Sequence, residues 1–173
     1  MSLKNKTIIV DAGHGGDHYG VTHDGVKEKN ITLPIAQKLK SKLESEGAIV
    51  YMTRTDDNPP WIDTDINDRV NYINNRFRNN YHALVSIHLN RPLGRVGAFY
   101  QSGNSSSLAS TIGFLYGQAT YSGDYAILRD TLGSSIPKAL VEVGRISYYK
   151  VTRDSWQEQQ ADNIFYGLRA FFM

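Results

Sequence analysis

Three apolar runs in this chain each end in a side chain that can bind a metal or carry a proton. These junctions are Val10-Asp11, Ile87-His88 and Val141-Glu142. Short, continuous apolar runs are typical of strands buried on both faces, as in a parallel sheet. Burying an unpaired carboxylate costs several kcal/mol, so Glu142 needs a partner, a proton or a chemical role. The chain is therefore expected to form a buried sheet with reactive groups at its strand ends.

Composition narrows the kinds of site that this chain can build. Its 173 residues are enough for one domain, and the lack of cysteine excludes disulfides and thiolate metal sites. Any zinc site must then use histidine and carboxylate. The net charge of +2 comes from scattered lysines and arginines, which does not predict nucleic acid binding. No apolar stretch reaches the roughly 18 residues of a membrane span, and no signal peptide is visible.

The first half of the chain alternates strand and helix signals. Strands are predicted at 6–11, 48–53 and 83–88, and helices at about 30–46 and 63–78. The segment 12–27, rich in glycine and histidine, is predicted to be a long loop, and so is the proline-containing segment 56–61. The first loop has neither a Walker lysine nor the dinucleotide glycine spacing, which disfavours phosphate binding.

The second half continues the pattern. Strands are predicted at 97–101, 125–128 and 138–143, and helices at 105–119 and 154–171. The last helix is expected to bury Trp156, Ile164, Leu168 and Phe171. The whole pattern predicts an α/β fold: a single domain with a mostly parallel, twisted sheet of about six strands and helices on both faces.

Four side chains are predicted to gather at one edge of this sheet. Ligands of an open α/β sheet bind beyond the carboxyl ends of its strands. His14, His88 and Glu142 follow or end predicted strands, and Glu28 closes the loop after the first strand, next to a helix start that favours negative charge. Two histidines and two glutamates are the inventory of a zinc hydrolase. A His₂Glu set leaves one coordination position for water, and the second carboxylate acts on that water.

Taken singly, these residues have simpler explanations. His14 could be an incidental residue of a turn, and Glu28 could be a solvated residue at a helix start. His88 could be a hydrogen-bonded histidine at a strand end, and Glu142 could form an ion pair with Arg145. All four explanations would have to hold by coincidence. The combined site is therefore the favoured interpretation.

The sequence around these residues also carries recognisable motifs. They are VDAGHGG at 10–16, KEKN at 27–30, TRTD at 53–56, SIHLN at 86–90 and LVEVG at 140–144. Together they resemble the zinc-dependent N-acetylmuramoyl-L-alanine amidases of the amidase-3 family, in order from about residue 6 to the final helix. The resemblance implies one amidase-3-like catalytic domain over residues 1–173, of which 1–3 are a candidate remnant of expression. If they are, a leader could have been removed.

The resemblance also implies a function. His14, Glu28 and His88 would bind one zinc ion per chain, and Glu142 would be the catalytic acid/base. The reaction would be hydrolysis of the amide between N-acetylmuramic acid and L-alanine of peptidoglycan, by a zinc-activated water. We expect a monomer whose partner is peptidoglycan, with no nucleic acid partner and no membrane span. It would act at the bacterial cell wall, and autolysin, phage endolysin and sporulation roles stay open.

Further candidates and rival functions rest on fewer residues. Asp11 and Asn90 are close enough in sequence to orient the zinc-binding histidines. Arg54 and Arg145 are candidates for substrate contact. Either arginine could instead hold the terminal carboxylate of a free peptide in a zinc carboxypeptidase-like peptidase. A catalytically inactive wall-binding module would bind peptidoglycan without metal or turnover.

The chain departs from the amidase-3 pattern beside the site. Leu89 stands where a small residue is usual, and the segment 145–148 reads RISY where the family has an aromatic residue or leucine and an asparagine. The segment 103–129 is short and lacks an Arg-Gly element. These differences are expected to reshape the substrate groove. No inserted helix or wall-binding module is recognised, so an open catalytic domain is expected.

Overall fold

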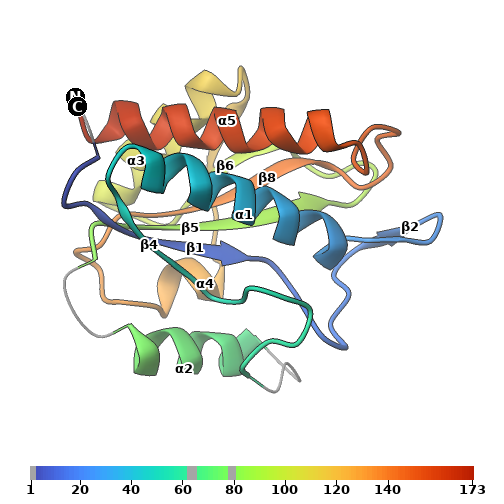
Figure 1. Cartoon of the computed structure of the whole chain (residues 1–173), viewed down its shortest axis with the longest axis horizontal. Helices are drawn as coiled ribbons and strands as arrows, with labels where there is room; N and C mark the ends of the chain where they lie inside the picture. The colour runs from blue at the N-terminus through green and yellow to red at the C-terminus, as the bar shows by residue number, and fades with distance from the viewer. Residues whose placement is uncertain (1–2, 62–65, 78–80) are drawn as a thin grey trace.

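The fold is built on one six-stranded sheet (Figure 1). The computed structural model describes residues 3–61, 66–77 and 81–173. Across the sheet the strands are β4 (Ile49–Met52), β1 (Thr7–Ala12), β5 (Ala83–Asn90), β8 (Lys138–Arg145), β6 (Gly97–Tyr100) and β7 (Ala119–Ser122). All neighbours are parallel except β6 and β8, which are antiparallel. The predicted α/β class and mostly parallel sheet are confirmed.

Helices cover both faces of the sheet, as Figure 1 shows. One face carries α1 (Lys29–Ser45), α3 (Asn104–Leu115) and α5 (Asp154–Phe171), and the other carries α2 (Ile66–Arg76) and α4 (Ala126–Arg129). Each face has its own apolar core. None of the helices in the described part of the chain has the length and hydropathy to cross a bilayer.

Strand alternation decides which face each polar strand-end residue occupies. Successive side chains of a strand point to opposite faces. In β8, Leu140 packs in the core under α2 and α4, whereas Val141 and Val143 pack in the core under α1, α3 and α5. Glu142 therefore lies on the α2/α4 face. The same alternation in β5 puts His88 there, and the two residues are register partners on neighbouring strands.

The segment 12–27 is not a simple loop as predicted. It contains a small antiparallel hairpin of β2 (Thr22–His23) and β3 (Val26–Lys27). Asp24 and Gly25 connect the two strands with φ values of 46° and 78°. A two-residue Asp-Gly connection with both φ positive is a preferred hairpin turn, so the sequence did carry a signal for this element.

The predicted strand at 125–128 is wrong, because this segment forms α4. A short apolar run has no period long enough to distinguish strand from helix, and Ile127 and Leu128 pack in the α2/α4 core. The strand of this region is instead β7, which begins where the helix predicted over 105–119 was expected to end. The observed helix, α3, stops at Leu115. The ends of the helix predicted over 63–78 lie partly outside the described residues; within them α2 spans Ile66–Arg76.

Candidate functional site

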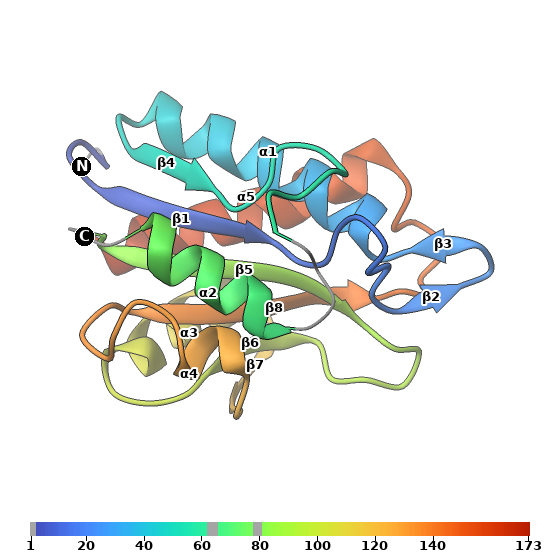
Figure 2. The same ribbon diagram turned by 90° about the horizontal axis from the view of Figure 1, so that it is seen from below.

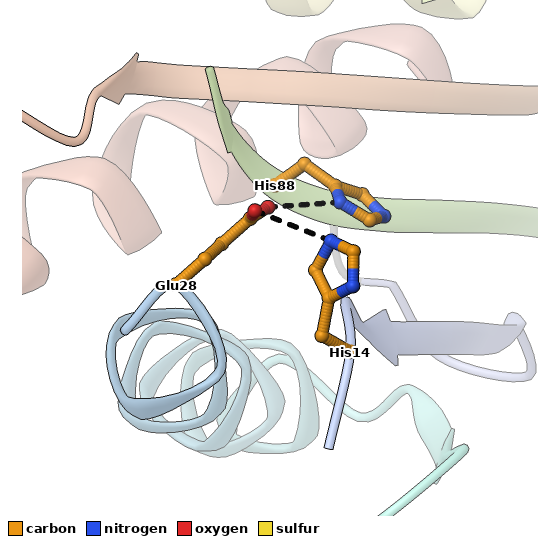
Figure 3. A group of neighbouring side chains, drawn as sticks. All are labelled: His14, Glu28 and His88. Atoms are coloured by element: carbon orange, nitrogen blue, oxygen red, sulfur yellow. Dashed lines mark hydrogen bonds and ion pairs between the residues drawn. The ribbon is translucent and has the colours of Figure 1, made fainter. Parts of the chain in front are cut away.

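Three side chains from separate segments converge at the carboxyl edge of the sheet. His14 follows β1, Glu28 precedes α1, and His88 lies on β5. A ring nitrogen of each histidine faces one oxygen of the Glu28 carboxylate (Figure 3), with 3.2 Å between His14 Nε2 and Glu28 Oε2 and 3.0 Å between His88 Nδ1 and Glu28 Oε1. One potential ligand atom from each residue lies within 4.8 Å of the others. This geometry can hold a metal ion.

The Glu28 carboxylate is held rigidly as an anion. It is 1% exposed, and it accepts hydrogen bonds from the backbone N–H groups of Val21 and Leu89, each at 2.8 Å. Burial alone would raise the pKa of Glu28, but the hydrogen bonds with His14 and His88 outweigh it and hold that pKa well below its usual range. Burial lowers the pKa of His14, which favours the neutral ring that binds metals.

Local backbone conformation aims His14 at Glu28. His14 has a φ of 64°, in the left-handed region that non-glycine residues rarely adopt. Gly20, with a φ of 68°, packs so closely that a Cβ at this position would collide with Glu28 Oε2 and His14 Cδ2. The glycine-rich segment thus allows the chain to close around the site.

Arg54 ties the two segments that carry His14 and Glu28. It is 2% exposed, its Nε donates to the Ala12 carbonyl at 3.0 Å, and its Nη2 donates to the Lys29 carbonyl at 2.9 Å. Its Nη1 donates to the Asp56 carbonyl. A buried guanidinium used in this way supports the backbone of the site. It does not supply the exposed arginine that a carboxypeptidase-like peptidase needs.

Asp11 and Asn90 lie close to the site, but neither side chain forms a hydrogen bond with His14 or His88 within residues 3–61, 66–77 and 81–173. The buried Asp11 carboxylate accepts hydrogen bonds from Thr53 Oγ1 at 2.7 Å and Ser86 Oγ at 2.6 Å. Asn90 Nδ2 donates to the Arg95 carbonyl at 3.0 Å. Both side chains therefore brace neighbouring segments.

Glu142 is the unusual carboxylate of the site. It is 8% exposed, and its Oε2 atom has no hydrogen-bond partner in the described part of the chain. Burial and the negative charge of Glu28 raise its pKa to about 8. Arg145 forms no ion pair with Glu142 among the described residues; its Nε donates to the Gly94 carbonyl at 2.9 Å. The carboxyl group therefore requires either a proton or a nearby cation.

Two residues near the site escaped sequence reasoning. Arg69 of α2 is buried, and its Nη1 lies 3.7 Å from Asp11 Oδ2. Arg69 precedes Ile73 by four residues, so the two lie on the same buried face of a helix. This spacing could have predicted that Arg69 is buried. Tyr125 lies near Glu142, whose charge adds to burial in raising the pKa of the tyrosine. The chain turns back after β7, and this turn brings Tyr125 close to Glu142.

Comparisons with known proteins agree with this geometry. The family model described as N-acetylmuramoyl-L-alanine amidase matches residues 8–170. A putative N-acetylmuramoyl-L-alanine amidase, YrvJ of Bacillus subtilis, is 35% identical over 99% of this chain and 34% of its own length. A probable cell wall amidase, LytH of Staphylococcus saprophyticus, is 33% identical over 98% of this chain and 60% of its own length. The chain thus spans about a third to three fifths of these two relatives.

Solved structures show the same fold. The CwlD amidase of Clostridioides difficile, in complex with the GerS lipoprotein, has a TM-score of 0.86 and 29% identity, covering 97% of this chain and 98% of that one. The catalytic domain of CwlV, an N-acetylmuramoyl-L-alanine amidase from Bacillus (Paenibacillus) polymyxa, has a TM-score of 0.80 and 25% identity, covering 96% and 98%.

Proposed function

The chain belongs to the N-acetylmuramoyl-L-alanine amidase family, and we propose that it is a zinc-dependent enzyme that cleaves the amide between N-acetylmuramic acid and L-alanine in peptidoglycan. Residues 1–173 would form a single catalytic domain. The observation that carries the proposal is the convergence of His14, Glu28 and His88 near a buried Glu142, one oxygen of which has no hydrogen-bond partner among the described residues.

The donor set fits zinc. Two imidazoles and one carboxylate make up a common set for catalytic zinc. A cation would compensate the buried negative charge of Glu28, which the neutral ring of His14 does not. When bound, zinc would supply Lewis-acid chemistry, activating a water and polarising the amide carbonyl.

Glu142 would move the proton in this reaction. Its carboxylate would accept a proton from the attacking water, and the carboxylic acid would then give that proton to the departing alanine nitrogen as the carbon–nitrogen bond breaks. A pKa raised to about 8 in the metal-free protein keeps the proton on Glu142 at neutral pH. A cation beside it would lower this pKa and free the carboxylate to act as a base.

The setting of the reaction follows from the substrate. We propose that the protein acts as a monomer on peptidoglycan at the bacterial cell wall. The similar CwlD structure contains a lipoprotein, so a partner-bound form is the alternative. Measuring the mass of the purified protein in solution distinguishes the two states.

The decisive experiment measures metal content and reaction products together. Purified protein should contain about one zinc per chain and release new L-alanine amino termini from isolated peptidoglycan. Chelation should stop the release, and added zinc should restore it. Binding to the wall without new amino termini would instead indicate an inactive wall-binding module. Cleavage of free peptides from their carboxyl ends, with no action on the wall, would indicate a peptidase.

A further inference from the structure

A groove of about 440 Å³ lies beside β6, and Tyr125, one of its lining residues, lies near Glu142. Its lining comes partly from the loop between β5 and β6, and it also includes Phe99, Ser122 and Tyr125. Phe99 packs in the α2/α4 core, so the groove opens on the face of the sheet to which Glu142 points. Figure 2 shows the β5–β6 loop at the same end of the sheet as the β2–β3 hairpin. The groove therefore lies at the same end of the sheet as the candidate site.

The β5–β6 loop is fixed in place. Asn90 Oδ1 accepts a hydrogen bond from the backbone N–H of Arg91 at 2.9 Å, and Asn90 Nδ2 donates to the Arg95 carbonyl at 3.0 Å. Arg145 on β8 donates to the Gly94 carbonyl. These contacts preorganise the loop, which lowers the entropic cost of binding a ligand.

The loop carries two guanidinium groups whose charges are not neutralised. Arg91 and Arg95 are exposed, and neither forms an ion pair within the parts of the chain that the structure describes. Arg95 lies over the Tyr121 ring, 5.0 Å from its centroid. The acidic residue of the groove, Asp124, is paired with Arg129 at 2.8 Å. The groove is therefore positive, and guanidinium groups bind carboxylates through two parallel hydrogen bonds.

Strand register gives the distance between this loop and Glu142. Gly97 is the register partner of Glu142, and Arg95 precedes it by two residues, which span at most about 7 Å of backbone. An arginine side chain from this loop can therefore bind a group roughly one amino-acid residue away from the proton that Glu142 transfers.

The direction of the reaction decides which half of the substrate crosses the groove. In the proposed function, on which this inference rests, Glu142 gives its proton to the departing alanine nitrogen. The peptide half must then lie on the Glu142 side of the cleaved bond, over β6 and away from His88. The first carboxyl group beyond the cleaved bond belongs to the second residue of the stem peptide.

We propose that Arg91 and Arg95 form a binding site for the free carboxylate of the second stem residue, so that the enzyme prefers stems in which this carboxyl group is not amidated. The arginines act on the peptide half of the substrate. They determine specificity and take no part in the proton transfer.

The test uses two N-acetylmuramoyl peptides that differ only in the second residue, whose free carboxyl group is either ionised or amidated. The zinc-loaded enzyme should cleave the free-carboxylate substrate with a kcat/KM about tenfold higher. Raising the salt concentration should reduce this preference, because the arginines are exposed. Arg91→Glu should reverse it, and Arg95→Gln should reduce it severalfold.

Arg169→Glu is the charge-matched control, because Arg169 lies on α5 and does not line the groove. It should keep the wild-type preference. The Arg91 side chain forms no hydrogen bond or ion pair within the described residues, so its variant remains informative if Arg95→Gln loosens the packing on Tyr121. Equal cleavage of both substrates by wild type, or an unchanged preference in Arg91→Glu, would overturn the arginine site and leave the amidase proposal intact. Failure to cleave either substrate would overturn both.

Discussion

Glu28 and Glu142 occupy the same edge of the sheet, yet the protein treats them in opposite ways. Glu28 accepts two backbone hydrogen bonds and faces two histidines, whereas Glu142 Oε2 has no partner among the described residues. The pKa of Glu28 is lowered, and that of Glu142 is raised to about 8. The surroundings alone thus make one carboxyl group a fixed anion and the other a carboxylic acid, which the proposed mechanism uses as its proton carrier.

The backbone explains this difference. Glu28 precedes a helix and faces the ends of two other segments, where the N–H groups of Val21 and Leu89 are free to donate. Glu142 lies on β8 between β5 and β6, in the interior of the sheet. There the neighbouring backbone groups pair with one another in the strand ladder. A carboxylate on a central strand therefore finds few donors.

The largest expected effect comes from replacing each carboxylate by its amide. Glu142→Gln should lower kcat by about 10³-fold while about one metal ion per chain is retained, because only proton transfer is lost. Glu28→Gln should lose both activity and metal. Metal analysis and wall digestion of the two purified variants separate these outcomes.

Glu158→Gln provides the control for this pair, since Glu158 is a partly exposed acid on α5 paired with Lys38 and Lys42. It should keep both metal and activity. Wild-type digestion by Glu142→Gln would refute the assignment of the proton carrier.

A smaller effect is expected from replacing Arg54, which holds the segments beside His14 and Glu28 and is not bonded to Glu142 among the described residues. Arg54→Lys should lower the free energy of unfolding by about 3–4 kcal/mol, because a lysine cannot reproduce donation to the Ala12, Lys29 and Asp56 carbonyls. Metal affinity should fall as well, while the pKa of Glu142 should not change.

Denaturant unfolding and metal competition with a chelator measure these effects. Arg129→Lys is the control, because Arg129 is exposed and should contribute little. Unaltered metal affinity in Arg54→Lys would show that Arg54 does not position the ligands.

The pH dependence of stability should have opposite signs for the two carboxylates in metal-free protein. The pKa of Glu142 is about 8 in the folded protein, whereas its ordinary value, expected in the unfolded chain, is 4.5. Stability from this group is complete below pH 4.5 and is lost as the pH rises to 8, by up to about 5 kcal/mol. Glu28 has a lowered pKa, so its contribution is present above its ordinary pKa and is lost as the pH falls below it.

Comparing unfolding free energies of metal-free wild type and Glu142→Gln between pH 4 and pH 9 isolates the first effect. The difference between the two proteins should shift in favour of Glu142→Gln as the pH rises. Parallel curves would mean that Glu142 is not buried as a neutral acid.

The smallest effect tests how closely the loop packs on Glu28. Gly20→Ala should destabilise the protein by about 1–2 kcal/mol and weaken metal binding, because its Cβ would strike Glu28 and His14. Gly25→Ala has a similar positive φ but meets nothing within 4 Å, so only backbone strain remains. Equal metal affinities in the two variants would show that the contact of Gly20 with the site is unimportant.

The sequence predicted much of the fold because its strongest signals are local. Continuous apolar runs located β1, β5 and β8, and helical periodicity located α1 and α5 close to their observed ends. The segment 119–129 was assigned wrongly, because a four-residue apolar run such as Ala126–Arg129 becomes helix or strand according to the core that it meets. Longer segments with a clear period are less dependent on such contacts.

The same distinction holds at the site. The sequence by itself determined that His14, Glu28, His88 and Glu142 would lie at one edge of the sheet, since parallel strands that end in polar residues must align those ends. Only the tertiary structure decided how each is used. Arg54 donates to backbone carbonyls, Arg145 donates to the Gly94 carbonyl of the β5–β6 loop, and Glu142 Oε2 has no hydrogen-bond partner among the described residues. The reason is physical: secondary structure follows from neighbouring residues, whereas hydrogen-bond partners and burial depend on segments far apart in the chain.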